Sequence, residues 1–319
     1  MSAARLDLRP HKHPKCGGKN CPERDNVDAD GLCTHTMSAT DGFPLRCVGD
    51  WAAEKIYWLV RYFGIFTGSM FPLWRGNLNY VEICSGPGRC IAREAREEID
   101  GTSLAIASSP GFQKLRAALF IDNNQKVVDT LNHRLSARGA TKKAKAVIGD
   151  YTDLPGMANL LASLPQGCLN LVFIDPTDCS VPFSTVRKIA ATLKSVDYII
   201  NVALGTDANR NLAKAILHPT HTTSRHKYES FLGAPGFCSR PETIAKAKLK
   251  DSDDLRRLFR DQYRASLKQE GFIYSDPISV EHYYYLLFAS RHQTGYDLWQ
   301  KIQTVDPAGQ RTLSLPGLE

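Results

Sequence analysis

Short apolar segments alternate with helical segments through the middle of the chain, and this alternation limits the fold more than any other feature. The apolar segments are about six residues long and rich in Val, Ile, Leu and Phe, which is typical of strands buried on both faces. The segments between them carry apolar residues at helical spacing. Together they predict an α/β fold with a parallel sheet covered by helices. The predicted strands are 79–84, 117–121, 144–148, 169–174 and 196–204, and the predicted helices lie near 90–98, 124–137, 154–164 and 184–193.

The two ends of the chain depart from this alternation. The N-terminal residues are rich in Cys, His, Gly and Pro and lack periodicity, so we expect a loop-rich segment before a helix that Asp50 caps. After the fifth strand the pattern becomes helical, and two consecutive strands, 272–280 and 283–290, then predict a terminal antiparallel hairpin. The expected organisation is an N-terminal segment 1–49, a domain 50–303 with a helical insertion 206–270, and a tail 304–319.

Composition narrows the class of protein. The chain has 319 residues, of which 43% are hydrophobic, so it can bury a core and is not disordered as a class. No apolar run approaches the roughly 18 residues that span a bilayer. The polar stretch 1–19 has no apolar core of a signal peptide. We therefore expect a cytoplasmic protein that does not bind membranes.

An acidic residue lies near the end of each of the first four predicted strands. Glu82 lies within the first strand, and Asp122, Asp150 and Asp175 follow the other three. In an open parallel sheet, ligands bind at the carboxyl ends of the strands. Glycines after the first strand let the backbone turn tightly and approach a ligand. Asp122 is placed to accept hydrogen bonds from a ribose diol, and Asp150 to meet an adenine amino group. The candidate cofactor-binding residues are Glu82, Ser85, Gly86, Gly88, Asp122, Asn123, Asp150 and Tyr151.

This constellation resembles the class I S-adenosylmethionine-dependent methyltransferases, which implies a Rossmann-like sheet and S-adenosylmethionine as cofactor. Cys84 stands where that family has the first glycine of its motif. Glu82 and Asp122 are also about twice as far apart as the ordinary ~20 residues, and we take 101–112 as the inserted loop. A dinucleotide-binding Rossmann protein is the alternative, and the terminal hairpin favours the methyltransferase topology.

A closer resemblance covers residues 50–303 and concerns the bacterial three-Cys-motif partner protein family. It implies a methyltransferase-like fold and a phage-type three-Cys-motif protein as partner, and it supplies no substrate. The alternative function is therefore a non-catalytic partner protein that keeps the fold for binding. The segments that carry the resemblance are 51–55 (WAAEK), 80–88 (YVEICSGPG), 109–110 (SP), 173–176 (FIDP) and 285–290 (YLLFAS) with Trp299.

Asp175 and Pro176, after the fourth strand, are the main catalytic candidates. In amino-methylating enzymes an Asp or Asn before Pro binds the acceptor amine, so the resemblance implies adenine N-methylation as one activity. Thr177 and Asp178 replace the expected Pro-aromatic pair, and Asp178 is the candidate base. Cys179 is interpreted as a structural thiol, with a nucleophile of the kind used on cytosine C5 as the alternative.

Four of the nine cysteines fall within the first fifty residues. Because disulfides are rare in the cytosol, this cluster indicates a metal site before it indicates bridges. Four thiolates, or three with an imidazole, match a structural zinc site. Incidental thiols in a disordered tail and an iron–sulfur site are the alternatives. The candidate ligands are Cys16, Cys21, Cys33, Cys47 and His35.

The positive charge of the chain is unevenly distributed. The net charge is +7, and residues 210–270 contain thirteen Lys or Arg against seven Asp or Glu. A basic segment of this kind suggests an anionic partner, with nucleic acid as the first candidate. The alternative is a solvated helical surface without a partner. His218, His221 and His226 lie in the same segment and are assigned to that surface rather than to a metal.

Overall fold

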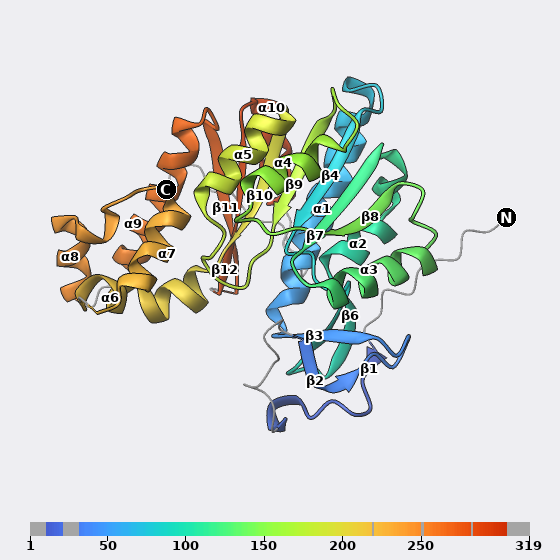
Figure 1. Ribbon diagram of the computed structural model, residues 1–319, viewed down its shortest axis with the longest axis horizontal. Helices are drawn as coiled ribbons and strands as arrows, with labels where there is room; N and C mark the ends of the chain where they lie inside the picture. The colour runs from blue at the N-terminus through green and yellow to red at the C-terminus, as the bar shows by residue number, and fades with distance from the viewer. Residues whose placement is uncertain (1–10, 22–31, 219, 250–251, 282, 305–319) are drawn as a thin grey trace. The chain divides into compact units, whose positions relative to one another are not determined.

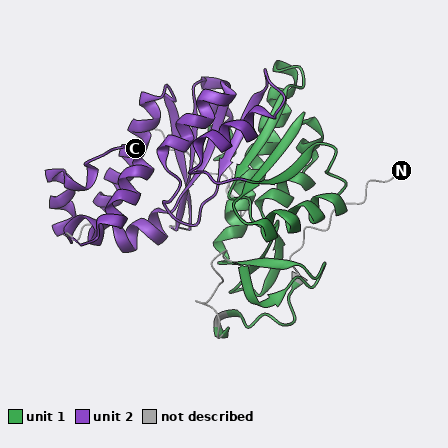
Figure 2. Cartoon of the chain, viewed as in Figure 1, with its two compact units in different colours: residues 1–148, 300–319 green, residues 149–299 purple. Residues whose placement is uncertain are grey.

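The computed structural model describes residues 11–21, 32–218, 220–249, 252–281 and 283–304 (Figure 1). The chain divides into two compact units, residues 1–148 with 300–319, and residues 149–299 (Figure 2). Among the described residues, none of the helices combines the length and the apolar character that crossing a bilayer requires.

The larger sheet has seven strands in the order β11-β12-β10-β9-β4-β7-β8. β4, β7 and β8 pair in parallel, as do β9 and β10, whereas β12 runs antiparallel to both β10 and β11. This order, with a terminal hairpin added antiparallel beside the fifth strand, confirms the predicted Rossmann-like methyltransferase fold class. The bounds are β4 Leu78–Ile83, β7 Ala117–Asp122, β8 Ala144–Ile148, β9 Leu169–Ile174, β10 Val196–Val202, β11 Tyr274–Val280 and β12 Tyr284–Ser290.

Helices connect these strands much as the periodicity predicts. In the first unit, α1 runs through Gly64 and Gly68 and ends beside Pro72, so it is longer than those glycines suggest. Asn124 caps α3 by accepting a hydrogen bond from the Val127 amide. The helices of this unit are α1 Trp51–Leu73, α2 Thr102–Ser108, the 3₁₀ turn η2 Pro110–Lys114 and α3 Gln125–Ala137, and α10 Gln293–Ile302 spans the boundary between the units.

The predicted helical insertion is present in the second unit. Its helices share an aromatic core in which Phe231 stacks between Phe259 and Tyr263, with ring centroids 5.8 and 4.7 Å away. This core explains why a segment rich in Lys and Arg still folds. The bounds in this unit are α4 Leu154–Ala162, α5 Phe183–Leu193, the π-helix η3 Leu204–Ala208, α6 Asn209–Leu217, α7 Thr222–Leu232, η4 Phe237–Ser239, α8 Pro241–Lys248 and α9 Ser252–Gln269.

The helix predicted near 90–98 is wrong. These residues form a hairpin, β5 Arg89–Ala92 and β6 Glu97–Asp100, with Arg96 in a left-handed conformation between the strands. Their Arg- and Glu-rich sequence suits a helix, but pairing with strands elsewhere in the chain overrides local propensity. The inserted loop predicted at 101–112 is also wrong, because α2 and η2 occupy it. The hairpin is the insertion that separates Glu82 from Asp122.

The N-terminal segment does not fold apart from the rest of the first unit. A five-stranded sheet has the order β1-β6-β5-β3-β2, and β3 pairs in parallel with β5. The segment predicted as loop-rich thus supplies strands to a sheet that the hairpin completes. We call this sheet with its connections the N-terminal module. Its N-terminal elements are β1 His11–Lys12, η1 Gly18–Asn20, β2 Leu32–Met37 and β3 Pro44–Val48.

Candidate functional site

The loop after β4 keeps a glycine-type backbone although its first glycine is replaced. Cys84 has a φ of 63°, in the left-handed region that favours glycine, and Gly86 and Gly88 follow with φ values of 63° and 89°. A Cβ on Gly88 would lie 2.9 Å from side-chain atoms of Leu104 and Leu131. Cys84, which stands in place of the first glycine of the motif, therefore adds a side chain but keeps a glycine-type backbone conformation in the loop.

Asp122, at the end of β7, braces this loop. Its Oδ2 accepts a hydrogen bond of 3.0 Å from the Gly86 amide, and its Oδ1 accepts a longer one from the Asn124 amide. The carboxylate is half-buried and keeps acceptor capacity for hydroxyl groups. The two candidates 36 residues apart in the sequence are thus in direct contact, whereas Asn123 beside them is exposed.

Two other predicted residues lie within the loop region. The Oγ of Ser85 is buried and has no hydrogen-bond partner among the described residues. A buried hydroxyl without a partner is costly, which suits a position that a ligand completes. Glu82 is fully buried in β4, where its carboxylate accepts hydrogen bonds from Tyr80 and from Thr102 at the start of α2. Glu82 therefore holds β4 to α2 beneath the loop.

Arg134 on α3 joins the glycine loop to the N-terminal module, and the sequence offered no sign of this role. It is buried and donates two hydrogen bonds of 2.8 Å to the Asp41 carboxylate. It also donates to the carbonyls of Pro87, at 2.7 Å, and Pro44, at 3.0 Å. Burial acts to raise the pKa of Asp41, but Arg134, with smaller contributions from the Phe43 amide and Ser38, outweighs it and lowers that pKa to about 2.

The second unit contains the predicted catalytic residues. Asn201 on β10 donates a hydrogen bond of 2.8 Å to Asp175, which joins the ends of β9 and β10. The Oδ1 of Asn201 is buried and has no partner among the described residues. Its amide nitrogen also lies 3.4 Å from the Pro176 carbonyl, so the orientation of the amide is set by two acceptors. This pair presents acceptor oxygens, which suit a group that carries N–H or O–H.

Asp178 belongs to a charge cluster centred on a buried carboxylate. Lys227 on α7 contacts Asp178 at 3.3 Å and Asp207 at 2.7 Å. Burial acts to raise the pKa of Asp207, but Lys227 and three further hydrogen-bond donors lower it. The same two carboxylates raise the pKa of Lys227 against the effect of burial. The candidate base Asp178 is thus partly neutralised by a cation that the sequence did not single out.

Cys179 and Phe183 do not face a ligand. Both side chains are fully buried, and the ring of Phe183 packs edge-on against Tyr263. Burial, above all, and the nearby Asp207 raise the pKa of the Cys179 thiol well above its ordinary value. A thiol in this state is a poor nucleophile, which supports the interpretation of Cys179 as structural.

The remaining candidates after β8 lie at the start of the second unit. The Asp150 carboxylate is exposed and accepts hydrogen bonds of 2.7 Å from the amide and the hydroxyl of Thr152. Tyr151 donates a hydrogen bond from its hydroxyl to Ser180 in the loop after β9. Asp150 therefore caps its own turn, and Tyr151 ties that turn to the loop that carries Asp175.

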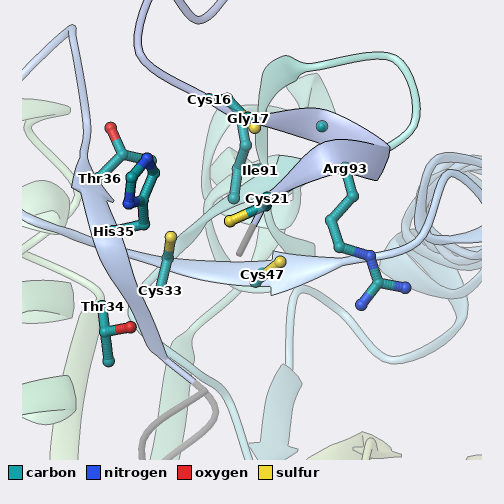
Figure 3. Close-up of a pocket in the computed structure, with 11 residues that line it drawn as sticks. Cys16, Gly17, Cys21, Cys33, Thr34, His35, Thr36, Cys47, Ile91 and Arg93 are labelled. Carbon is teal, nitrogen blue, oxygen red and sulfur yellow. The ribbon is translucent and has the colours of Figure 1, made fainter. Parts of the chain in front are cut away.

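All five predicted metal ligands line one cavity in the N-terminal module. Cys16, Cys21, Cys33 and Cys47 surround a cavity of about 20 Å³, and the exposed His35 also lines it. Figure 3 shows the sulfurs of Cys21, Cys33 and Cys47 turned toward the same space. Burial is the main cause that raises the pKa of Cys47 to about 11. The thiols of Cys33 and Cys16 also raise this pKa, and Arg93 acts to lower it. Among the described residues, however, no three His, Cys, Asp or Glu side chains are arranged to hold a metal ion.

The basic segment is helical and partly paired. Lys246 forms an ion pair with Asp254, and Arg256 with Asp253. Residues of α6, α8 and α9 line a cavity of about 290 Å³ whose rim includes Lys214, Lys246 and Arg256. His218, His221 and His226 are exposed. These observations agree with a solvated helical surface and leave an anionic partner as a proposal.

Comparisons with known proteins add little beyond this geometry. No protein-family model and no curated protein matches the chain. Among solved structures, an O-methyltransferase from Bacillus cereus in complex with SAH is 11% identical, with a TM-score of 0.37, over 71% of this chain and 80% of that one. TomG, an O-methyltransferase from Streptomyces achromogenes in complex with SAM, is 12% identical, with a TM-score of 0.35, over 72% and 79%. Likenesses with such low TM-scores carry no argument, so the fold assignment rests on the strand order.

Proposed function

We propose that this protein is an S-adenosylmethionine-dependent methyltransferase. The observation that supports this most is the contact between Asp122 and the Gly86 amide, in a loop that keeps glycine-type φ angles at residue 84. The unpartnered Ser85 hydroxyl supports it independently, because a ligand in the loop would satisfy it. The strand order of the sheet agrees with the topology of the class I S-adenosylmethionine-dependent methyltransferases, which the sequence resembles.

The bound cofactor would supply a methyl group already activated on a sulfonium. The protein then has to position the methyl acceptor against the cofactor and to accept a proton from the acceptor. Asp122 would accept hydrogen bonds from the ribose hydroxyls, and the loop 85–88 would let its backbone approach the cofactor closely. Asn123, Asp150 and Tyr151 are proposed as further cofactor-binding residues. Glu82 acts from beneath by holding β4 to α2.

We propose Asp175, with Pro176 and Asp178, for the methyl acceptor. The Asp175 carboxylate and the Asn201 amide oxygen would bind an acceptor through its N–H or O–H groups. Asp178 would take a proton, and Lys227 contacts its carboxylate at 3.3 Å. A nucleic acid held by residues 210–270 or a substrate bound to a partner protein is the proposed acceptor.

A second candidate function is a non-catalytic binding protein, for example a partner of a phage-type three-Cys-motif protein. The contact between Asp178 and Lys227 favours it, because an oxygen of the candidate base is already engaged by a cation. The absence of an aromatic residue at 177 and 178 favours it as well. A cytoplasmic location is part of both proposals, and the nine free cysteines support it.

We also propose a structural zinc site in the N-terminal module, formed by Cys16, Cys21, Cys33 and Cys47 with His35 as the substitute ligand. It is supported by the gathering of the four cysteines around one cavity. The side chains have to rotate about their χ1 bonds to close on a metal, because as described they form no such group. Elemental analysis of the purified protein tests this, and a zinc content near zero would refute it.

Calorimetric titration with S-adenosylmethionine tests the main proposal. We expect saturable binding that Asp122→Asn weakens at least tenfold, since an amide cannot accept on both sides as the carboxylate does. Asp129→Asn is the matched control, because Asp129 is exposed on α3 and its side chain accepts a hydrogen bond from Gln125. No heat at millimolar cofactor with a folded protein would refute the methyltransferase and leave the binding protein.

A further inference from the structure

Strand β3 of the N-terminal module presents different chemistry on its two faces. Leu45 and Cys47 point to the face that packs with Cys16 and Ile91. Because side chains alternate along a strand, Arg46 points to the opposite face. The glycine loop lies on that side, because Arg46 side-chain atoms are the nearest neighbours of a Cβ placed on Gly86.

Arg46 lies over the glycine loop. Its Nη1 is 3.4 Å and its Cδ is 3.9 Å from the position that a Cβ on Gly86 would take. The Gly86 amide meanwhile donates to Asp122. A cation and an anion therefore lie beside the same glycine. Arg46 lies next to the α-carbon of Gly86, and Asp122 accepts the hydrogen bond from its amide.

The Arg46 guanidinium has no hydrogen-bond or ion-pair partner among the described residues, although its side chain is half-buried. The other arginines near the loop differ, because Arg89 and Arg134 both form ion pairs with acidic side chains. A half-buried guanidinium loses hydration, and its five donors in a planar fork match the oxygens of a carboxylate or a phosphate. An anion is therefore the group that this position lacks.

We propose that Arg46 binds the carboxylate of the methionine moiety of S-adenosylmethionine. This inference rests on the proposed function and identifies a residue for it that lies outside the glycine motif and the strand ends. A ligand with a ribose diol and a carboxylate satisfies Asp122 and Arg46 together, because the diol donates and the carboxylate accepts. The N-terminal module is then part of the cofactor site.

The backbone of β3 supports this role for Arg46. The residue pairs with Cys90 of β5 on one side and with Leu32 of β2 on the other. Two strands therefore hold its α-carbon, and the side chain needs only to turn toward the ligand. Since Arg134 also ties the Pro44 carbonyl to the Pro87 carbonyl, the start of β3 and the loop share one anchor.

Calorimetry with two probes tests the inference on the full-length protein. The probes are S-adenosylmethionine and its decarboxylated form, which lacks only the carboxylate. We expect Arg46→Met to weaken binding of S-adenosylmethionine about 10- to 100-fold, as the loss of a charged hydrogen-bonded pair implies, and to change binding of the decarboxylated form less than twofold. Arg46→Lys should retain part of the preference. Arg116→Met is the matched control, because the Arg116 side chain is exposed and its hydrogen-bond partner among the described residues is Asn77.

The outcomes separate the inference from the proposed function. Equal weakening of both probes by Arg46→Met would overturn the inference, since Arg46 would then only shape the loop. Unchanged binding of both probes would overturn it as well. A wild-type protein that binds neither probe would overturn the proposed function, and the inference with it. Thermal unfolding of each variant shows that the change in binding does not arise from misfolding.

Discussion

The pair formed by Asp41 and Arg134 offers the sharpest test of how the N-terminal module is attached to the glycine loop. We consider Asp41→Asn, which removes the charge and keeps the shape. Arg134 is 3% exposed and would stay buried, still bonded to the carbonyls of Pro87 and Pro44 but without its counter-ion. Leaving a buried cation without its anion destabilises the folded state.

The magnitude follows from the pKa of Asp41, which falls from 3.8 to about 2 in the folded protein. One pKa unit corresponds to about 1.4 kcal/mol, so the contacts of the ionised Asp41 carboxylate, with Arg134 as the largest, stabilise the folded state by about 2 kcal/mol at neutral pH. The side chain of Asp41 is 22% exposed, and solvent screening moves the value toward the lower side.

The sign of the pH dependence is set by the lowered pKa. The stabilisation is fully present above the unfolded pKa near 4 and is lost as the pH falls toward the folded pKa near 2. At pH 3 about half of it remains. Asp41→Asn should therefore lower the free energy of unfolding at pH 7 and approach the wild type near pH 2.

Urea unfolding at several pH values, followed by circular dichroism, measures this difference. Asp129→Asn serves again as the control, because Asp129 is exposed and its side-chain hydrogen bond is to Gln125 on the same helix. A deficit of Asp41→Asn that is below 0.5 kcal/mol at pH 7, or that stays constant between about pH 7 and pH 2, would refute the reasoning.

Three further substitutions test the glycine loop and the charge cluster. Cys84→Gly should raise the free energy of unfolding by about 1 kcal/mol, because Cys84 has a φ of 63° that costs little only for glycine; an unchanged or lower melting temperature would contradict this. Gly88→Ala should destabilise the protein by about 2–3 kcal/mol, because its Cβ would lie 2.9 Å from Leu131 and its φ is 89°; wild-type stability in urea would contradict it. Lys227→Met should lower the free energy of unfolding by about 3 kcal/mol, because Asp207 would be buried without its cation. The melting temperature should then fall by several degrees, and a variant with the wild-type melting temperature would show that Lys227 and Asp207 are not coupled.

The local sequence pattern predicted secondary structure correctly where residues close in sequence decide the conformation of a segment. The strands at 144–148 and 169–174 have the predicted bounds, and α3, Gln125–Ala137, begins one residue after the predicted start. These signals are local because alternation, helical spacing and capping involve residues close in sequence. The pattern failed at 90–98, where a partner strand more than forty residues away decides the conformation.

The candidate site divides in the same way. The sequence alone determined the class of sheet, the glycine loop and the acids that end the strands, because those residue types carry their chemistry wherever the chain places them. Only the tertiary structure decided which of them touch: Asp122 with Gly86, Asn201 with Asp175, Lys227 with Asp178. It also brought Arg46 and Arg134 to the loop from segments without a motif. A side chain whose role depends on distance to a residue far along the chain leaves no periodic trace, so its role becomes visible only when the backbone is folded.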